Sequence, residues 1–259
     1  DQIYREFPLR AGRVSVRGNK AHRDQRTVLR ADYALFYKAN IPIAVVEAKD
    51  NNQTVGSGMA QAINYADLLG VPFSFSSNGD GFVFRDATMA TGVLELTISL
   101  AEFPSPTELW RRYCTWKGWT PEVERIAGFD YSPSKTPRYY QLNAINRTVE
   151  AIAGGQNRVL LVMATGTGKT YTAFQIIWRL WKSKQKKRIL FLADRNILVD
   201  QTKNNDFKPF GATMTKISKR QIDTAYEIYL SLYQAVSGNE EEKNIYKQFS
   251  RDFFDLVVV

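Results

Sequence analysis

The most constraining feature of this chain is the run VLLVMATGTGKT, in which apolar residues give way abruptly to Gly166, Gly168, Lys169 and Thr170. A strand that ends in a glycine-rich loop and continues as a helix is the usual setting of a phosphate-binding loop. Glycines let backbone N–H groups curve around an anion, Lys169 can reach the β- and γ-phosphates, and Thr170 can hold Mg²⁺. The sequence therefore predicts a strand at 159–163, a P-loop and a helix that bind ATP.

The loop departs from the general pattern G-x-x-x-x-G-K-[ST] at its first position, where the chain has Met163. The form ATGTGKT instead resembles the P-loop of superfamily 2 helicases and translocases. A loop of this composition could merely turn the chain, but the predicted strand before it and helix after it favour phosphate binding. The predicted nucleotide-binding residues of the loop are Thr165, Gly166, Thr167, Gly168, Lys169 and Thr170.

Length, charge and composition limit the class of protein. The chain has 259 residues, of which 44% are apolar, enough for one or two packed domains. It lacks an apolar run of membrane-spanning length and begins with polar residues, so we expect a cytoplasmic protein without a membrane partner. A formal net charge of +9 favours a polyanionic partner, which for an ATPase suggests nucleic acid. The basic run 182–188 fits a DNA contact or a solvated loop.

The single cysteine and the single histidine exclude several kinds of site. Cys114 alone cannot form a disulfide within the chain and is expected to pack among aromatic residues. His22 lies in a charged segment without a second histidine, which gives little support to histidine-based catalysis.

Proline and serine in the segment FDYSPSKTPR predict a linker at 129–138 between two domains, 1–128 and 139–259. Apolar periodicity in the first domain predicts strands at 30–37, 43–49, 72–76 and 82–85 and helices at 57–69 and 107–116. In the second domain it predicts helices at 140–153, at 169–181 and near Leu198, and strands at 188–193, 228–232 and 256–259. Helices that alternate with apolar strands indicate a parallel sheet covered on both faces.

Two carboxylates and a lysine form a second constellation, Asp32 in RADYALFY and Glu47 and Lys49 in VVEAKD. Residues two apart in a strand share a face, so Glu47 and Lys49 point the same way. If the two strands pair as a hairpin about Ala39-Asn40, Asp32 lies across from Glu47. Opposed like charges destabilise a strand pair unless a cation lies between them. The pattern therefore predicts a Mg²⁺ site, with Lys49 placed to orient water or offset charge on a phosphate.

This spacing resembles the PD-(D/E)xK nucleases, although Ala31 replaces the proline of the family name. Ordinary surface charges on an exposed strand could give the same pattern. The following helix carries Gln61 and Tyr65 four residues apart, on one face, in a Q-x-x-x-Y element. That element resembles the one that follows the catalytic strand in type I restriction enzyme R subunits. Glu6 is a possible further ligand that the sequence does not separate from a surface glutamate.

The order and spacing of these elements together resemble the N-terminal part of the type I restriction enzyme R subunit. The resemblance runs through RADYALFY, PIAVVEAKD, QAINYADLLG, FSSNGDGFVF, RYYQLNAI, VLLVMATGTGKT and ILFLADRNILVDQ. It implies an α/β chain, with a PD-(D/E)xK nuclease-like mixed sheet and flanking helices, followed by an incomplete RecA-like parallel α/β P-loop domain. It also implies that Gln141 reads the adenine edge and that Ala193-Asp194-Arg195 lies near a DNA-contacting motif.

The resemblance implies ATP-dependent translocation on double-stranded DNA coupled to Mg²⁺-dependent cleavage. The implied metal ligands are Asp32, Glu47 and Thr170, and the implied catalytic residues are Asp32, Glu47, Lys49, Gln61 and Tyr65. The implied partners are a modification methyltransferase subunit and a specificity subunit. The sequence ends at Val259, where the family continues into an acidic Walker B box, so we expect this polypeptide to bind nucleotide weakly without turning it over.

Three other interpretations remain open on the sequence alone. The chain could be a helicase–nuclease of DNA repair or of a type III-like restriction system, which needs no methylation partners. It could be a DNA-translocating ATPase whose first domain is an inactive clamp. A P-loop kinase or GTPase is disfavoured by the Gln141 element and by the lack of a guanine-reading motif.

Overall fold

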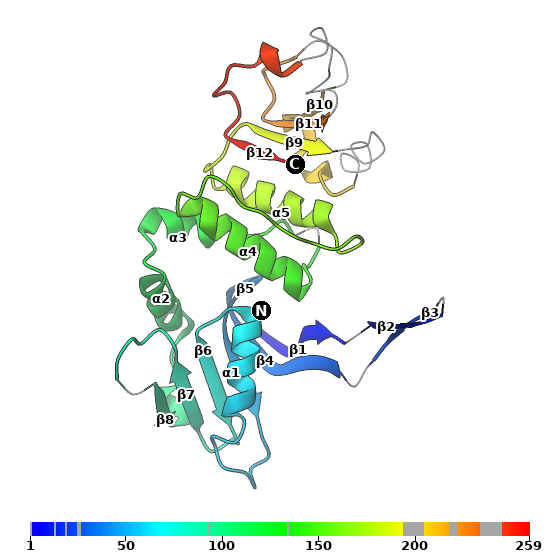
Figure 1. The fold of residues 1–259 in the computed structure, drawn as a ribbon. Coiled ribbons are helices and arrows are strands. Elements are labelled where there is room, and N and C mark those ends of the chain that lie inside the picture. The colour runs from blue at the N-terminus through cyan, green and yellow to red at the C-terminus, as the bar shows by residue number, and fades with distance from the viewer. Residues whose placement is uncertain are drawn as a thin grey trace. The chain divides into compact units, whose positions relative to one another are not determined.

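The computed structural model describes residues 2–259 except positions 13, 19, 25–26, 93, 134, 194–204, 218–221 and 234–244. The chain divides into two compact units, unit 1 (Asp1–Glu150) and unit 2 (Ala151–Val259). Figure 1 labels the helices and strands of both units.

Unit 1 is built on a mixed sheet. Its strands are β1 (Ile3–Ala11), β4 (Val28–Lys38), β5 (Ile41–Ala48), β6 (Phe73–Ser77), β7 (Phe82–Asp86) and β8 (Glu95–Ile98). They lie side by side in the order β1-β4-β5-β6-β7-β8, with β5 and β6 parallel and the other neighbours antiparallel. The helices that begin in this unit are α1 (Met59–Leu69), α2 (Pro106–Trp116), α3 (Pro121–Ala127) and α4 (Tyr139–Ala153), with a short 3-10 helix at Leu100–Glu102. The predicted mixed sheet with flanking helices is confirmed.

Residues with positive φ shape the turn before β5 and the end of α1. Asn40 has φ 64° in the β4–β5 turn, a conformation that asparagine tolerates better than most residues. Gly70 has φ 71° at the end of α1, where its N–H bonds to the carbonyl of Asp67 and the N–H of Val71 to that of Ala66. These bonds satisfy carbonyls that the helix end leaves unpaired. Helix α1 thus ends cleanly and returns the chain to β6, parallel to β5.

Helix α1 packs on the sheet through an apolar cluster. The buried members of the cluster are Leu9, Ala31, Val45, Tyr65, Ala66, Leu69 and Val71. Helix α4 adds a second contact, in which Leu142 packs with Ala34 and Phe36 of β4. The core therefore lies directly beneath β4 and β5, the two strands that carry the predicted acids.

The boundary between the units falls inside α4 because the first turns of this helix are fixed to unit 1. The side-chain amide of Asn143 donates to the carbonyl of Leu68 at 2.9 Å, and that of Asn146 donates to the carbonyl of Asn40 at 3.1 Å. The predicted domain limits at 128 and 139 remain predictions.

A small hairpin is inserted between β1 and β4. Its strands, β2 (Val14–Arg17) and β3 (Lys20–Arg23), form a separate antiparallel pair, which Figure 1 shows beyond the end of the six-stranded sheet. Gly18 has φ 60° in the turn, a conformation that favours glycine. Gly12 has φ 85° at the base, and a Cβ there would lie 2.5 Å from the carbonyl oxygen of Asp24. The two glycines therefore suit the turn and the close approach at the base.

Unit 2 contains a parallel sheet. Its strands are β9 (Ile189–Ala193), β10 (Met214–Lys216), β11 (Ile228–Leu232) and β12 (Leu256–Val258), and its helix is α5 (Lys169–Lys182), with 3-10 helices at Lys208–Thr213 and Ile245–Gln248. The strand order is β10-β11-β9-β12 and every pairing is parallel. One apolar cluster includes Phe174 and Ile177 of α5 with Ile189 of β9, and a second includes Leu190 of β9 with Phe253. Side chains that alternate along β9 thus enter two cores, which confirms the predicted parallel sheet with both faces covered.

The strand predicted at 159–163 is absent, and this prediction is wrong. No strand is present there, and Leu160 and Val162 are 86% and 89% exposed. A strand needs a neighbour to satisfy its N–H and C=O groups, and among the described residues β12 is the edge of the sheet with β9 as its one partner. The apolar run 159–163 has the pattern of a buried strand, but the described part of the chain offers it no strand to pair with.

The helix predicted near Leu198 lies outside the described residues. Among the helices that the structure describes, none combines the length and the apolar character needed to cross a membrane. The basic run 182–188 packs at both ends: the Lys182 ammonium lies 4.7 Å from the centre of the Trp181 ring, and the Arg188 guanidinium lies 4.4 Å from that of Phe253.

Candidate functional site

The β4–β5 hairpin places Asp32 next to Glu47. Tyr33 pairs with Val46 in the antiparallel ladder, and one further step along both strands brings Asp32 across from Glu47. Side chains directly opposite one another share a face of an antiparallel pair. The Asp32 carboxylate also accepts a hydrogen bond from the N–H of Ala48 at 2.8 Å, which fixes it against the end of β5. The structure therefore has the register that the sequence predicts.

Lys49 links this strand pair to α1. Its ammonium donates to Glu47 Oε1 at 2.9 Å and to Gln61 Oε1 at 3.0 Å. The Gln61 amide in turn donates to the Tyr65 hydroxyl at 2.9 Å, one helical turn further along the same face. The structure thus brings the five predicted catalytic residues together, with Asp32 adjoining Glu47.

Glu47 is an acid in an environment that disfavours its charge. It is 2% exposed, and its Oε2 has no hydrogen-bond partner among the described residues. Burial raises the pKa of Glu47 above its ordinary value of 4.5; the Lys49 ammonium opposes this increase and the Asp32 carboxylate adds to it. A buried carboxylate oxygen without a partner is costly, so this oxygen favours either a proton or a cation.

These residues fit a hard divalent cation with few protein ligands. The two neighbouring carboxylates supply oxygen ligands, and Glu47 Oε2 is the unsatisfied atom that a cation would bind. No group of three or more His, Cys, Asp or Glu side chains with suitable geometry occurs in the described part of the chain. Mg²⁺ commonly retains several waters and uses one or two carboxylates, so a two-carboxylate site suits it.

Glu6 lies at the next register position, on β1. Arg5 pairs with Tyr33 and Phe7 with Ala31, which places Glu6 across from Asp32. Its φ of 49° is positive, and its side chain, 66% exposed, forms an ion pair with Arg30 at 3.9 Å. The carboxylate of Glu6 therefore pairs with a cation of β4.

The sequence analysis missed Ser76 and Gly58, which support this network. Ser76 is the register partner of Glu47 in the parallel β5–β6 pair and is fully buried. Its hydroxyl accepts from the N–H of Gly58 at 3.0 Å and donates to the carbonyl of Val55 at 2.7 Å. Serines at alternate positions of the run FSFSS were the signal available in the sequence.

Replacing Gly58 by alanine is expected to destabilise the site. The added Cβ would lie 2.9 Å from Ser76 Oγ and 3.0 Å from Glu47 Cγ, closer than such atoms pack. Overpacking of this kind costs about 1–3 kcal/mol, so the midpoint of thermal unfolding should fall by several degrees. Gly56→Ala is the matched control, because its Cβ would meet Val83 Cγ2 at an ordinary 3.5 Å. Equal midpoints for the two variants would contradict this close packing.

The predicted P-loop forms a turn before α5. Gly166 and Gly168 have φ of 78° and 82°, which only glycine adopts readily, and Gly168 caps the N-terminus of α5. The Thr167 hydroxyl donates to the carbonyl of Ala164 at 2.6 Å. The exposed Lys169 donates to the carbonyl of Met163 at 3.4 Å. The loop thus places a lysine and backbone N–H groups at the N-terminus of a long helix. This arrangement is suited to binding phosphate.

The other predicted nucleotide and DNA contacts are less well defined. Gln141 is 6% exposed, and its side chain accepts from the N–H of Arg138 at 2.9 Å, as one half of a capping box at the start of α4. Its predicted role in reading adenine remains a prediction. Asp194 and Arg195 of the predicted DNA-contacting motif lie outside the described residues.

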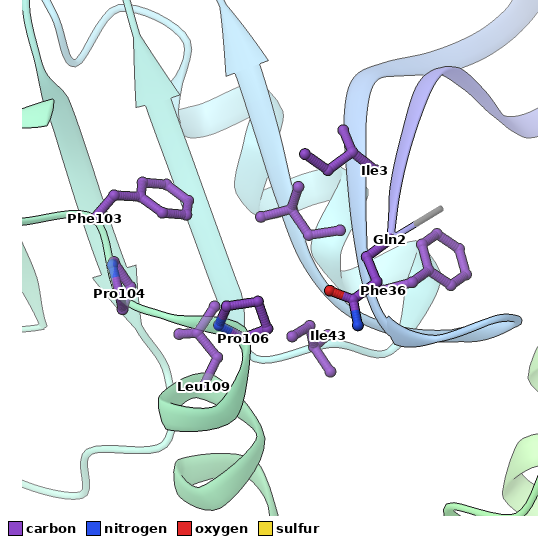
Figure 2. A pocket seen from close by; sticks show the side chains of 9 residues that line it. Gln2, Ile3, Phe36, Ile43, Phe103, Pro104, Pro106 and Leu109 are labelled. Carbon is purple, nitrogen blue, oxygen red and sulfur yellow. The ribbon is translucent and has the colours of Figure 1, made fainter. Parts of the chain in front are cut away.

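Unit 1 also contains an apolar hollow. It has a volume of about 510 Å³ and lies between β4 and β5 on one side and the stretch from Phe103 into α2 on the other (Figure 2). Side chains such as Phe36, Ile43 and Leu109 line it, and its one polar side chain, Gln2, donates to the carbonyl of Tyr37. Without a titratable group in its lining, this hollow is no candidate for metal-dependent chemistry.

Comparison with known proteins identifies similar chains for both units. The family described as "Type III restriction enzyme, res subunit" matches residues 134–259. The type I restriction enzyme EcoAI endonuclease subunit of Escherichia coli is 63% identical over 262 residues, covering 100% of this chain and 32% of that protein. The EcoKI endonuclease subunit of Escherichia coli strain K12 is 32% identical over 222 residues, covering 66% of this chain and 18% of that protein.

A solved structure agrees with these relatives. A fragment from Vibrio vulnificus YJ016, described as an HsdR subunit of a type I restriction enzyme, has a TM-score of 0.78 and 40% identity, and the match covers 98% of this chain and 45% of that one. The present chain thus spans about a third or less of the length of the two curated relatives.

Proposed function

The chain belongs to the family of type I restriction enzyme endonuclease subunits, and we propose that it cleaves DNA at the site formed by Asp32, Glu47 and Lys49. The observation that carries this proposal is the buried Glu47, whose Oε2 lacks a hydrogen-bond partner among the described residues while its Oε1 binds Lys49. In a buried ion pair that only stabilises the fold, both carboxylate oxygens are expected to have hydrogen-bond partners. The unsatisfied oxygen beside Asp32 is what a metal-dependent site requires.

The reaction is hydrolysis of a phosphodiester. A water loses a proton as its oxygen attacks phosphorus, the bond from phosphorus to the leaving sugar oxygen breaks, and that oxygen takes up a proton, so that the step balances. When bound by Asp32 and Glu47, Mg²⁺ supplies Lewis acidity toward the phosphate and acidifies a water. Lys49, fixed by Gln61, places a positive charge where negative charge develops on the phosphate. Tyr65 acts through Gln61 and is a positioning residue.

The P-loop supplies the second half of the proposed function. Thr165 to Thr170 would hold the phosphates of ATP, with Lys169 at the β- and γ-phosphates and the Thr170 hydroxyl on Mg²⁺. In the whole protein, ATP turnover would drive movement along double-stranded DNA. The named relatives are subunits, which supports assembly with modification and specificity subunits that select the DNA sequence.

Replacing Lys49 by alanine tests this function in the complete restriction complex. Loss of one charge that stabilises a transition state costs about 100-fold or more in rate. We therefore expect cleavage of plasmid DNA with Mg²⁺ and ATP to fall about 100-fold, while ATP hydrolysis is unchanged. The control is Lys38→Ala, an exposed lysine that pairs with Asp130 at 4.0 Å. Cleavage by Lys49→Ala at the rate of the Lys38→Ala control would remove Lys49 from the site.

A further inference from the structure

The segment that joins β1 to β4 is strongly basic, and the proposed chemistry does not use it. Residues 12–27, here called the basic arm, contain five Lys and Arg residues and one acid, Asp24. The segment includes the β2–β3 hairpin with its base. Five of the 35 basic residues of the chain therefore lie in one short insertion.

Charges on the described part of the basic arm are open to solvent. Lys20 and His22 of the arm are exposed, and so are Arg10 and Arg30 in the adjoining ends of β1 and β4. Arg10 and Lys20 form no ion pair with a described residue, and Arg30 forms one long contact with Glu6 at 3.9 Å. The arm thus carries one acid, Asp24, against five basic residues, which leaves it with an excess of positive charge.

The register of the hairpin places two basic residues opposite each other. Arg17 pairs with Lys20 on either side of the turn. Like charges directly opposite in a strand pair are destabilising, by up to about 1 kcal/mol. A polyanion bound between the two positive charges attracts both and so offsets their repulsion. A cation between Asp32 and Glu47 would act in the same way on two negative charges.

The basic arm continues the strands that carry the candidate site. It connects the end of β1 to the start of β4, and β4 contains Asp32 (Figure 1). Four residues separate Val28, where β4 begins, from Asp32, which at about 3.3 Å per residue is about 13 Å. That distance is covered by about four base pairs of duplex DNA. A duplex that runs along β4 with its scissile phosphate at Asp32 therefore passes within reach of the arm.

We propose that the basic arm binds the phosphate backbone of duplex DNA beside the cleavage site. This inference rests on the proposed nuclease function of Asp32 and Glu47 and names the surface that holds the substrate there. A two-stranded ribbon is narrow enough to lie along or within a groove of B-DNA. Residues 12–27 contain no Phe, Tyr or Trp, so the arm lacks the stacking platforms typical of single-strand binding.

The test measures duplex binding by the complete subunit in a chelator, so that no cleavage occurs. The variant Arg17→Gln/Lys20→Gln/Arg23→Gln is expected to bind a labelled duplex at least tenfold more weakly at about 100 mM salt. The plot of log affinity against log salt should become shallower by about 0.9 for each phosphate that the variant no longer neutralises. The variant Arg17→Lys/Lys20→Arg/Arg23→Lys keeps every charge and should restore most of the affinity.

The charge-matched control is Lys38→Gln/Arg111→Gln/Arg125→Gln, which removes three cations elsewhere in unit 1; Lys38 and Arg111 are exposed, and the Arg125 side chain is 50% exposed. If the arm variant has the affinity and salt dependence of this control, the proposal is overturned. If DNA binding is unchanged but the other subunits no longer copurify, the arm binds protein, which also overturns it. Failure of the proposed function would show separately, as absence of Mg²⁺-dependent cleavage by the unaltered complex.

Discussion

Replacing Glu47 by glutamine is expected to abolish DNA cleavage while making the protein more resistant to unfolding. Cleavage should fall about 1000-fold or more, because one of two carboxylates that hold the metal is lost. ATP hydrolysis by the complete complex should be retained, since the P-loop is unaltered. Cleavage is measured on plasmid DNA with Mg²⁺ and ATP, and unfolding in a chelator.

The gain in stability follows from the surroundings of Glu47. Its buried Oε2 lacks a partner among the described residues, and the nearby Asp32 raises its pKa further. A pKa raised on folding means that the carboxylate destabilises the fold above pH 4.5, and that this cost disappears as the group is protonated at lower pH. Glutamine keeps an acceptor for Lys49 and adds an N–H donor near Asp32. We expect unfolding at neutral pH to require about 1 kcal/mol more.

Glu95→Gln is the matched control for this pair of effects. Glu95 is 44% exposed and pairs with Arg85 at 3.1 Å, so its replacement should change the free energy of unfolding by less than about 0.5 kcal/mol. Cleavage should stay at the level of the unaltered protein. A Glu47→Gln variant that is less stable than Glu95→Gln would show that Glu47 is a structural ion-pair residue. Retained cleavage would remove Glu47 from the metal site.

The candidate site was predictable because local chemistry determines it. Asn40 at the turn and the apolar runs on either side set the register of β4 and β5, and the register alone brings Asp32 to Glu47. Helical spacing likewise placed Gln61 and Tyr65 on one face of α1. In each case, residues within one hairpin or one helix carry the information.

Features that depend on distant segments were not predictable in the same way. The support of the site by Ser76 and Gly58 needs β6 to lie beside β5, which the apolar pattern of neither strand specifies. The strand predicted at 159–163 fails for the opposite reason. Its apolar residues give the strand pattern, but a pattern does not supply the neighbouring strand on which a ladder depends.

The basic arm shows a third limit of sequence analysis. Its charge is plain in the sequence, yet the overall net charge of +9 spreads the same signal over the whole chain. Topology provides the missing information, because the hairpin joins the ends of the β1–β4 pair that contains Asp32. The fold and the position of the candidate site together thus assign part of the positive charge to one surface, the basic arm.

Replacing Lys169 by alanine is expected to lower ATP hydrolysis by the complete complex about 1000-fold, and ATP-dependent cleavage with it. The lysine is exposed at the start of α5, where it bonds weakly to the carbonyl of Met163 at 3.4 Å. Its loss should leave the fold intact, because this hydrogen bond contributes little stability, while the charge that meets the β- and γ-phosphates disappears. ATP turnover and DNA cleavage are measured on the same preparation.

Lys208→Ala is the control, since Lys208 is an exposed lysine of the same unit outside the loop.

The Lys169→Ala and Glu47→Gln variants together separate the two halves of the mechanism. Glu47→Gln should hydrolyse ATP without cleaving DNA. Lys169→Ala should do neither, because cleavage requires ATP-driven movement along DNA. ATP hydrolysis by Lys169→Ala at the rate of Lys208→Ala would refute the P-loop assignment. Cleavage that persists in Lys169→Ala after ATP hydrolysis is lost would show instead that the nuclease works without the motor.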